Sequence, residues 1–267
     1  MYFKKKDTQL YYEVVGNGEP LLVLHGFAVD HRILFNTIEN VLKHSAKEYR
    51  RIYIDLPGMG KSPAPSNIHN ADELLELLIS FIDEVIGKEK FSVIGNSYGG
   101  YLSIGITKKL SHQVNRLVLL APVIVADFQK RKLPQKKVAV REEIDYSGNE
   151  IAFEDYESMA VNITKNSFIR YLEEIYPALQ IAQFDYLNNY QSNGYQFSFE
   201  SILFDSTYTT EVLMVLGKQD NVVGFEDALS IQDSLPNIQT VILENAGHNL
   251  QLDQPDKVEK EIQSFLN

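Results

Sequence analysis

Short apolar runs of strand length alternate with helical patterns along most of the chain, and this alternation limits the possible folds more than any other feature. The later apolar runs are residues 91–95, 116–121, 211–217 and 240–243. The helical patterns are residues 70–87, 98–110, 227–235 and 256–266. A chain with this alternation forms a mostly parallel sheet that is covered by helices on both faces. The predicted fold class is therefore α/β.

The first part of the chain departs from this alternation. Strand-like runs at residues 11–15, 21–24 and 51–55 follow one another with no evident helix between them. A Gly-Asn-Gly turn signal at 16–18 separates the first two runs. We therefore expect the sheet to begin with an antiparallel hairpin.

The segment between Pro122 and Thr210 carries helical patterns but no convincing buried strand, and it is rich in Tyr and Phe. We expect residues 123–209 to form a helical cap inserted into a core of residues 1–122 and 210–267. The alternative is an ordinary run of helices packed on the edge of the sheet. With 267 residues, 44% of them hydrophobic, the chain is long enough to bury the core that such a domain needs.

The sequence Gly-Asn-Ser-Tyr-Gly-Gly at 95–100 follows an apolar strand and opens a helix. A sharp turn between strand and helix holds a serine in a strained backbone conformation, so small residues are needed on both sides of Ser97. The hydroxyl then projects above the sheet, and the helix N-terminus beneath it supplies a positive partial charge. We therefore predict that Ser97 is a nucleophile, with an ordinary turn serine as the alternative.

A serine nucleophile needs a base that is oriented by a third group. Asp220 follows the run at 211–217, and His248 follows the run at 240–243. Both residues come just after the carboxyl end of a strand, where open parallel sheets place their sites. We predict His248 as the base and Asp220 as the acid that orients it. The alternative acids are Asp127, Asp205 and Asp227.

An oxyanion hole is expected where His-Gly-Phe-Ala at 25–28 follows the strand-like run at 21–24. The backbone N–H groups of Phe27 and Tyr98 are the predicted donors to the developing oxyanion. Gly26 lets the backbone approach a substrate closely. The ring of His25 is expected to orient this loop rather than to react.

Together with Asp-Leu-Pro-Gly-Met-Gly-Lys-Ser at 55–62, these segments resemble the α/β-hydrolase superfamily over essentially the whole chain. The resemblance implies an eight-stranded, mostly parallel sheet with helices on its faces and a cap inserted after the sixth strand, here residues 116–121. It also implies the roles given above for the site residues, which are Ser97, Asp220, His248, Phe27 and Tyr98.

The serine at the turn narrows the reaction. Haloalkane dehalogenases and epoxide hydrolases of this superfamily carry Asp there, and proline iminopeptidases have a different oxyanion segment and a Trp after the serine. The Gly-Asn-Ser-x-Gly-Gly form resembles carbon–carbon bond hydrolases of aromatic catabolism, but their glycine-rich segment after His-Gly is missing here. We predict hydrolysis of a small carboxylic ester. The alternatives are carbon–carbon hydrolysis of vinylogous diketones and a non-catalytic small-molecule receptor.

The substrate is expected to have an apolar acyl or aromatic part, because aromatic residues are frequent in the predicted cap. Arg170 on a predicted cap helix has two interpretations, a contact with a substrate carboxylate or a solvated surface residue. Ordinary polar positions are expected for His31, His44, His69 and His112. No His-Glu-x-x-His motif is present, and position 55 is Asp where a phosphate loop needs Gly. We therefore expect neither a metal nor another cofactor.

Composition excludes further classes of function. The chain has no cysteine, which excludes disulfides, thiolate nucleophiles and cysteine-based metal sites. A formal net charge of −11 disfavours a nucleic-acid partner. No apolar run of about 18 residues is present, and the basic start lacks the apolar stretch of a secretory signal. We expect no membrane partner and a cytoplasmic location, while the oligomeric state stays open.

Overall fold

The computed structural model describes residues 1–43, 45–204 and 209–267 and contains one large sheet of eight strands. The strand order across the sheet is β1-β2-β4-β3-β5-β6-β9-β10. The strands are β1 (Tyr2–Lys5), β2 (Thr8–Val15), β3 (Glu19–Leu24), β4 (Tyr49–Ile54), β5 (Phe91–Asn96), β6 (Val114–Leu120), β9 (Glu211–Gly217) and β10 (Ile238–Leu243). The strands from β4 to β10 pair in parallel, so the predicted α/β fold with a mostly parallel eight-stranded sheet is confirmed.

The antiparallel start of the sheet differs from the prediction in its pairing. β1 and β2 form the hairpin, and β2 then pairs antiparallel with β4, while β3 lies between β4 and β5 and pairs in parallel with both. The predicted antiparallel start is present, but its hairpin joins β1 to β2, and the runs at 11–15 and 21–24 do not pair with each other. The helix α1 (Arg32–Lys43), which was not predicted, connects β3 to β4 and so lets these two strands pair in parallel.

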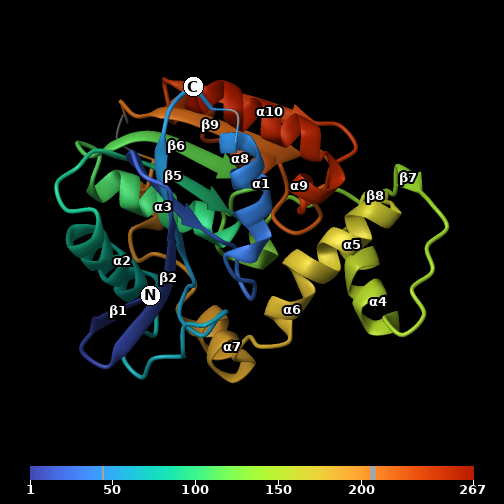
Figure 1. The fold of residues 1–267 in the computed structure, drawn as a ribbon, viewed down its shortest axis with the longest axis horizontal. Coiled ribbons are helices and arrows are strands. Elements are labelled where there is room, and N and C mark those ends of the chain that lie inside the picture. The colour runs from blue at the N-terminus through green and yellow to red at the C-terminus, as the bar shows by residue number, and fades with distance from the viewer. Residues whose placement is uncertain (44, 205–208) are drawn as a thin grey trace.

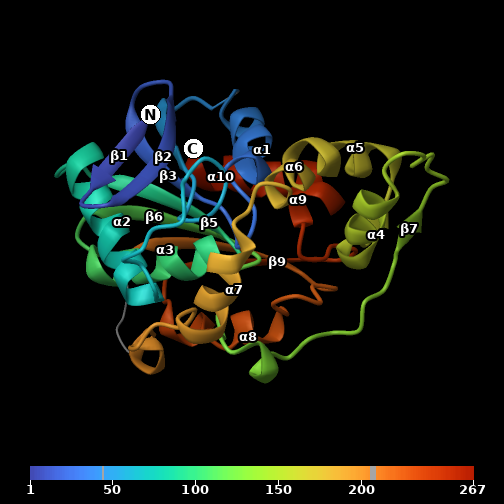
Figure 2. The same cartoon turned by 90° about the horizontal axis from the view of Figure 1, so that it is seen from below.

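Helices cover both faces of the sheet (Figures 1 and 2). On one face α1 packs against α10 (Pro255–Leu266), and on the other α2 (Ala71–Val85) packs against α3 (Tyr98–Lys109). The helix predicted at 227–235 is shorter and interrupted, as α8 (Glu226–Leu229) and the 3₁₀ turn η3 (Gln232–Ser234). A last short helix, α9 (Leu250–Asp253), precedes α10.

Local sequence explains the ends of α2. Asn70 has extended backbone angles, and its side chain accepts a hydrogen bond from the Glu73 N–H, which satisfies one of the free donors of the first turn. Asp72 and Glu73 in that turn interact favourably with the helix dipole. Gly87 follows the helix with φ of 74°, a left-handed conformation that glycine adopts at little cost.

Between β6 and β9 the chain leaves the sheet. This segment contains η1 (Phe128–Lys130), β7 (Val140–Arg141), α4 (Glu150–Met159), β8 (Asn162–Ile163), α5 (Lys165–Glu174), α6 (Tyr176–Leu179), α7 (Phe184–Asn193) and η2 (Glu200–Ile202). Figures 1 and 2 show α4 and β7 projecting to one side of the sheet, with α5, α6 and α7 leading back to it. β7 and β8 form a small parallel pair that the sequence pattern did not reveal.

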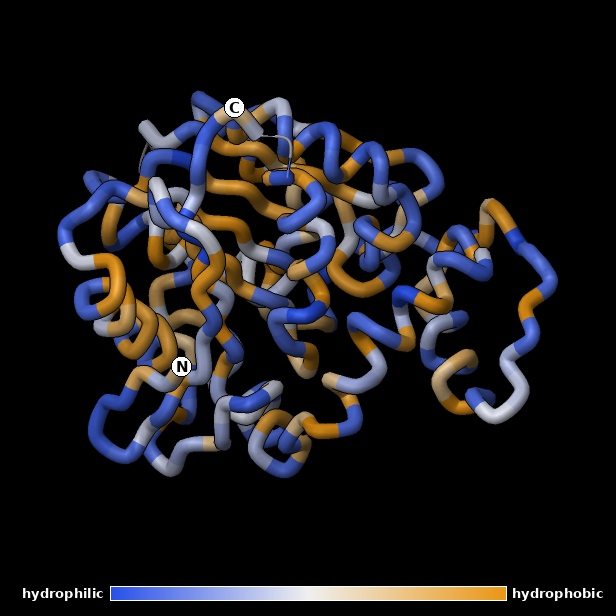
Figure 3. The backbone as a smooth tube through the Cα atoms, in the orientation of Figure 1, coloured by the Kyte–Doolittle hydropathy of each residue, from blue (hydrophilic) through white to orange (hydrophobic). Residues whose placement is uncertain are grey.

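The central strands form the core. In Figure 3 the hydrophobic stretches run along the middle of the sheet. Every residue of β5 is buried, and in β3 and β9 only the first residue is not. Leu24 of β3 stands level with Ile54 of β4 and Gly95 of β5. The carboxyl ends of three adjacent strands therefore meet at one edge, and the loops that follow them lie together there.

Candidate active site

Ser97 lies on the sharp turn between β5 and α3. Its backbone has φ of 52° and ψ of −117°, which is a strained conformation for a residue with a side chain. The turn is fixed from the neighbouring strand, because the Ser97 N–H donates to the Leu120 carbonyl oxygen at 3.0 Å and the Ser97 carbonyl oxygen accepts from the Val123 N–H at 3.0 Å. The hydroxyl is therefore held at the carboxyl edge of the sheet.

The glycines around this serine are required by close backbone contacts. A Cβ atom on Gly99 would lie 2.4 Å from the carbonyl oxygens of Leu24 and His25, and one on Gly95 would lie 2.5 Å from the Gly99 carbonyl oxygen. Both distances are too short for any side chain. The turn after β5 and the loop after β3 are thus packed backbone against backbone.

His248 and Asp220 reach this serine from loops after β10 and β9. His248 Nε2 lies 3.0 Å from Ser97 Oγ, and His248 Nδ1 lies 2.9 Å from Asp220 Oδ2. Because an ionised carboxylate only accepts hydrogen bonds, Nδ1 carries the proton and Nε2 is left to accept from the serine hydroxyl. The structure brings together the three residues predicted as nucleophile, base and acid.

Asp220 is held by its own loop. Its Oδ1 accepts hydrogen bonds from the N–H groups of Val222 at 2.9 Å and Val223 at 3.0 Å, and the carboxylate is buried. The alternative acids lie elsewhere. Asp127 forms an ion pair with Lys130, Asp227 accepts from the Lys132 N–H, and Asp205 falls outside the described residues.

Two backbone N–H groups beside Ser97 are free to bind an oxyanion. Within the described ranges, the N–H groups of Phe27 and Tyr98 have no hydrogen-bond acceptor. Tyr98 is the first residue of α3, so its N–H is one of the donors that a helix leaves unpaired. A Cβ atom on Gly26 would lie 3.1 Å from Ser97 Cβ, so the loop that carries Phe27 passes directly beside the serine.

His25 uses both ring nitrogens to hold this loop. Its Nε2 accepts a hydrogen bond from the Leu56 N–H at 2.9 Å, so the proton is on Nδ1, which donates to the Gly26 carbonyl oxygen at 2.6 Å. Burial lowers the pKa of this imidazole. The neutral ring therefore links the loop after β3 to the loop after β4.

Asp253 at the end of α9 is a residue that sequence reasoning missed. Its Oδ2 accepts from the Gly247 N–H at 2.8 Å, and its Oδ1 accepts from the N–H groups of Val161 at 3.0 Å and Asn162 at 2.8 Å. Burial raises the pKa of this carboxyl to about 6, against the effect of the three N–H donors. One carboxylate thus joins the loop of His248 to β8, and no motif in the sequence marks it.

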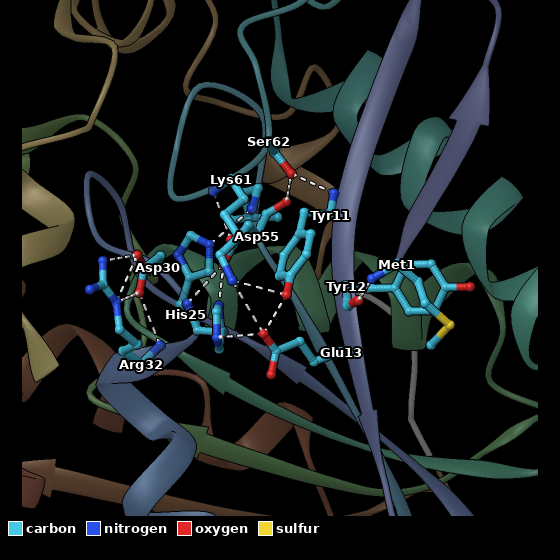
Figure 4. Close-up of polar contacts among 12 residues, drawn as sticks. Met1, Tyr11, Tyr12, Glu13, His25, Asp30, Arg32, Asp55, Lys61 and Ser62 are labelled. Carbon is cyan, nitrogen blue, oxygen red and sulfur yellow. Dashed lines mark hydrogen bonds and ion pairs between the residues drawn. The ribbon is translucent and has the colours of Figure 1, made fainter.

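His31 is a second departure from expectation, because it is buried rather than an ordinary polar residue. Its Nδ1 donates to Asp55 Oδ1 at 2.7 Å, and Asp55 also accepts from the Lys61 N–H at 2.8 Å. Figure 4 shows Asp55 among Ser62, Lys61, His25 and Tyr11. Asp55 directly follows β4, so the strand-end rule that selected Asp220 could also have selected it. His44 lies outside the described residues.

Arg170 has neither of its two predicted environments. Its guanidinium pairs with Glu174 at 2.7 Å, donates to the Gln251 carbonyl oxygen at 2.7 Å, and reaches Thr37 Oγ1 at 3.2 Å. The side chain is only 16% exposed. It joins α5 to α1 and α9 and is absent from the cavity at Ser97.

A cavity of about 290 Å³ opens at Ser97 and His248. Its aliphatic lining includes Val29, Ile33, Val123, Met159, Leu179 and Val223. Its remaining lining includes Phe27, Phe128, Tyr195, Gln191, Arg131 and Asp155. The segment after β6 therefore contributes much of the wall, and the serine faces a mainly apolar space with a few polar groups.

Aromatic contacts connect this segment to the turn that carries Ser97. The Tyr98 ring stacks on Tyr195 with ring centroids 4.0 Å apart, and its hydroxyl lies 2.8 Å from the Tyr190 hydroxyl. Phe27 packs edge-on against both Tyr98 and Tyr195. These rings therefore pack against one another, and Phe27 and Tyr195 also line the cavity.

The parallel sheet, the serine turn after β5 and the histidine after the last strand together define the class of α/β hydrolases. The family model for the alpha/beta hydrolase fold matches residues 19–255, and the chain belongs to this family. It is also similar to a crystal structure of an alpha/beta superfamily hydrolase from Oenococcus oeni PSU-1, with 33% identity and a TM-score of 0.92 over 100% of this chain and 98% of that one. The protein is a hydrolase.

Two further comparisons describe its relatives. A 2-hydroxy-6-oxo-6-(2'-aminophenyl)hexa-2,4-dienoic acid hydrolase from Metapseudomonas resinovorans is 24% identical over 273 residues, covering 96% of this chain and 87% of the relative. An esterase from Exiguobacterium antarcticum shares the fold with a TM-score of 0.72 and 18% identity, over 99% of this chain and 98% of that one. Among the described helices, none has the length and apolar character needed to cross a membrane.

Proposed function

We propose that the protein hydrolyses a small-molecule carboxylic ester through an acyl-enzyme on Ser97. The observation that carries this proposal is the line of hydrogen bonds from Asp220 through His248 to Ser97, at 2.9 Å and 3.0 Å. It is supported by the two unpaired N–H groups beside the serine. A nucleophile, an oriented base and donors for a negative oxygen are the parts that acyl transfer requires.

The proposed reaction has two steps, and neither uses a cofactor. In the first, His248 Nε2 takes the Ser97 proton, Oγ bonds to the ester carbonyl carbon, and the alcohol leaves with the proton from His248. In the second, His248 takes a proton from water, the hydroxide bonds to the acyl carbon, and Ser97 leaves with that proton. In both steps the negative oxygen is stabilised by the N–H groups of Phe27 and Tyr98.

The proposal includes a division of the chain into a core of residues 1–122 and 210–267 and a helical cap of residues 123–209. The cap side supplies Met159, Leu179 and Tyr195 to the cavity wall. A wall of this kind favours an apolar acyl or aromatic part in the substrate. The cytoplasmic location stays a prediction.

Carbon–carbon bond hydrolysis is the second candidate, and the relatives favour it. Three relatives that are 23–25% identical over at least 94% of this chain are named as hydrolases of 2-hydroxy-6-oxo dienoates or related dioates. In that reaction water adds across a C–C bond, so that one carbon becomes a carboxylic acid and the other gains a proton. A serine, a histidine and an oxyanion site at the same positions serve this chemistry as well.

The first test is labelling with a fluorophosphonate probe, read by intact mass. We expect one adduct on the wild type and none on Ser97→Ala. Ser103→Ala is the matched control, since its hydroxyl lies on α3 and donates only to the Gly99 carbonyl oxygen. An unlabelled wild type, or equal labelling of Ser97→Ala, would contradict the proposal and favour a binding protein.

The second test separates the two reactions. Initial rates are compared for benzyl esters of short acids and for a 2-hydroxy-6-oxo dienoate with the same enzyme preparation. Ester turnover that is lost in Ser97→Ala supports the first candidate. Turnover of the dienoate with kcat/KM at least about 100-fold above that of any ester would replace ester hydrolysis with carbon–carbon hydrolysis.

A further inference from the structure

A second, wider cavity of about 720 Å³ adjoins the one at Ser97. The two share a short boundary, which consists of Phe128, Arg131, Gln191 and Tyr195. The outer cavity is lined mostly by polar residues, including Gln129, Ser192 and Asn193. Arg131 lines both cavities. Its side chain lies where the apolar inner cavity meets the polar outer cavity.

The partners of Arg131 set it apart from the other arginines. The chain has seven arginines. Six of them form ion pairs with Asp or Glu, namely Arg32, Arg50, Arg51, Arg116, Arg141 and Arg170. Within residues 1–43, 45–204 and 209–267, Arg131 forms no ion pair. In a chain with a formal net charge of −11, an arginine in a cavity without an acidic partner is unusual.

Three backbone carbonyl groups hold the Arg131 guanidinium in place. Its Nε donates to Val125 O at 2.8 Å, its Nη1 to Val222 O at 3.1 Å, and its Nη2 to Ala126 O at 3.2 Å. These contacts orient the planar group, but they do not neutralise its charge. The side chain of Tyr195 interacts with Arg131 as well. A guanidinium has five N–H donors, so at most two remain for another acceptor.

The nearby carboxylates have other partners. Asp155, the acidic residue that lines the inner cavity, accepts a hydrogen bond from the Tyr171 hydroxyl. Asp127 lines the outer cavity and pairs with Lys130 at 3.0 Å. Asp127 is near enough for the charge of Arg131 to help lower the pKa of its carboxyl, but its ion pair is with Lys130. Arg131 therefore has no ion-pair partner among the described carboxylates, and it lines both cavities.

We propose that Arg131 is an anion subsite that binds a carboxylate on the substrate, so that the substrate class is a carboxylate-bearing ester or ketone rather than a neutral one. The reacting carbonyl would lie at Ser97, the apolar part along the inner wall, and the carboxylate at the boundary of the two cavities. The assignment of the reacting end rests on the proposed function. An oriented guanidinium with free donors is the group that best matches a carboxylate in charge and geometry.

A purely structural role for Arg131 predicts a different result. Arg131 donates to Val222 O, and the Val222 N–H donates to Asp220, so the arginine also supports the loop of the acid. Loss of that support would lower activity on every substrate to a similar extent. The test must therefore compare matched anionic and neutral ligands rather than activity alone.

The experiment measures binding by calorimetry in the Ser97→Ala background, where no turnover occurs. One ligand pair is monobenzyl glutarate and benzyl methyl glutarate, and the other is 4-(acetoxymethyl)benzoate and its methyl ester. The pairs carry the carboxylate on the acyl side and on the alcohol side. We expect a preference for the anion in at least one pair, which Arg131→Gln reduces about tenfold or more.

Lys130→Gln is the matched control. It removes the same charge from the adjacent residue, whose side chain is 75% exposed and lines neither cavity. We expect it to change the preference less than twofold. Arg131→Lys keeps the charge without the planar set of donors, and we expect it to retain part of the preference even if Arg131→Gln unfolds.

An unchanged preference in both pairs with Arg131→Gln, or an equal loss with Lys130→Gln, would overturn the subsite. A wild type that shows no preference for the anion in either pair would overturn it too. The binding preference is measured without turnover, so it does not depend on the proposed reaction. A failure of the proposed reaction would instead appear as missing probe labelling or missing turnover in the wild type. The two proposals can therefore fail separately.

Discussion

The described part of the chain contains two buried histidine–aspartate pairs with similar geometry and different surroundings. In one, His248 Nδ1 lies 2.9 Å from Asp220; in the other, His31 Nδ1 lies 2.7 Å from Asp55. Asp55 directly follows β4, and Asp220 lies shortly after the end of β9. Both aspartates also accept hydrogen bonds from backbone N–H groups. Distance and burial alone do not distinguish them.

The difference lies in what the second ring nitrogen faces. His248 Nε2 lies 3.0 Å from the Ser97 hydroxyl, at the wall of a cavity. His31 Nε2 lies 3.7 Å from Glu13 and lines none of the cavities at the site. A histidine between two carboxylates is stabilised as a cation, whereas a histidine between a carboxylate and a hydroxyl can accept a proton. The third group therefore decides what the pair can do.

The pKa of His31 follows this logic. Burial by itself lowers it, but the hydrogen bond to Asp55 and the charges of Asp55, Asp30 and Glu13 raise it overall. The pKa of Asp55 is lowered in spite of burial, chiefly by its hydrogen bond to His31. The His31 pair is thus a charged link between the loops after β3 and β4.

The largest contrast is expected in catalysis. His248→Gln removes the proposed base, so kcat/KM should fall about 10⁴-fold or more. His31→Gln leaves the serine and its base in place, so kcat/KM should change less than about threefold. Initial rates on the best ester from the screen measure both. Similar losses in the two variants would show that the His31 pair contributes to the reaction itself.

The aspartates give the next contrast. Asp220→Asn is expected to lower kcat about 10³-fold to 10⁴-fold, because the amide favours the wrong tautomer of His248. Asp55→Asn should instead lower the free energy of unfolding by about 3 kcal/mol, since His31 loses its buried partner. Urea unfolding and steady-state kinetics are measured on both variants. A stable Asp55→Asn with greatly reduced kcat would reverse the assignment.

The sequence was sufficient for the parallel part of the sheet and for the residues that meet at Ser97, because both follow from local pattern and strand ends. Gly95 and Gly99 flank a serine between an apolar strand and a helix, and this context constrains the backbone strongly. Asp220 and His248 each follow a strand of the same parallel sheet. Elements that end at one edge of a sheet must place their loops together.

Other features depended on contacts that no local pattern contains. Helix α1 is the exception, because Ile33, Leu34, Ile38 and Val41 recur with helical spacing and could have predicted it. The environment of Arg170 depends on Glu174 nearby and on Gln251 far along the chain. Whether an arginine is neutralised, as Arg170 is, or left without an acid, as Arg131 is, requires the three-dimensional structure.

The third prediction concerns pH and stability. Because the folded pKa of His31 is raised, its stabilisation is fully present below the unfolded value of about 6.5 and is lost as pH rises through the folded value. The wild type should therefore lose stability relative to His31→Gln as the pH rises above about 6.5. Asp253, whose pKa is raised to about 6, also lowers the stability as the pH rises. That change takes place around pH 6 and below, so it precedes the change caused by His31. Parallel stability curves for the two proteins would contradict a charged His31 pair.

The smallest effect is expected for the third group of the His31 pair. Glu13 is 32% exposed on its side chain and lies 3.7 Å from His31 Nε2, so solvent screens much of the interaction. Glu13→Gln should lower the free energy of unfolding by about 0.5 kcal/mol and leave kcat/KM unchanged. Ser97→Ala is the matched change for the other pair, because Ser97 is the group that His248 Nε2 faces. It should abolish activity and change the free energy of unfolding little. If Glu13→Gln instead impaired turnover, the two pairs would be functionally coupled through the loop that carries Phe27, and the third group could no longer be used to tell them apart.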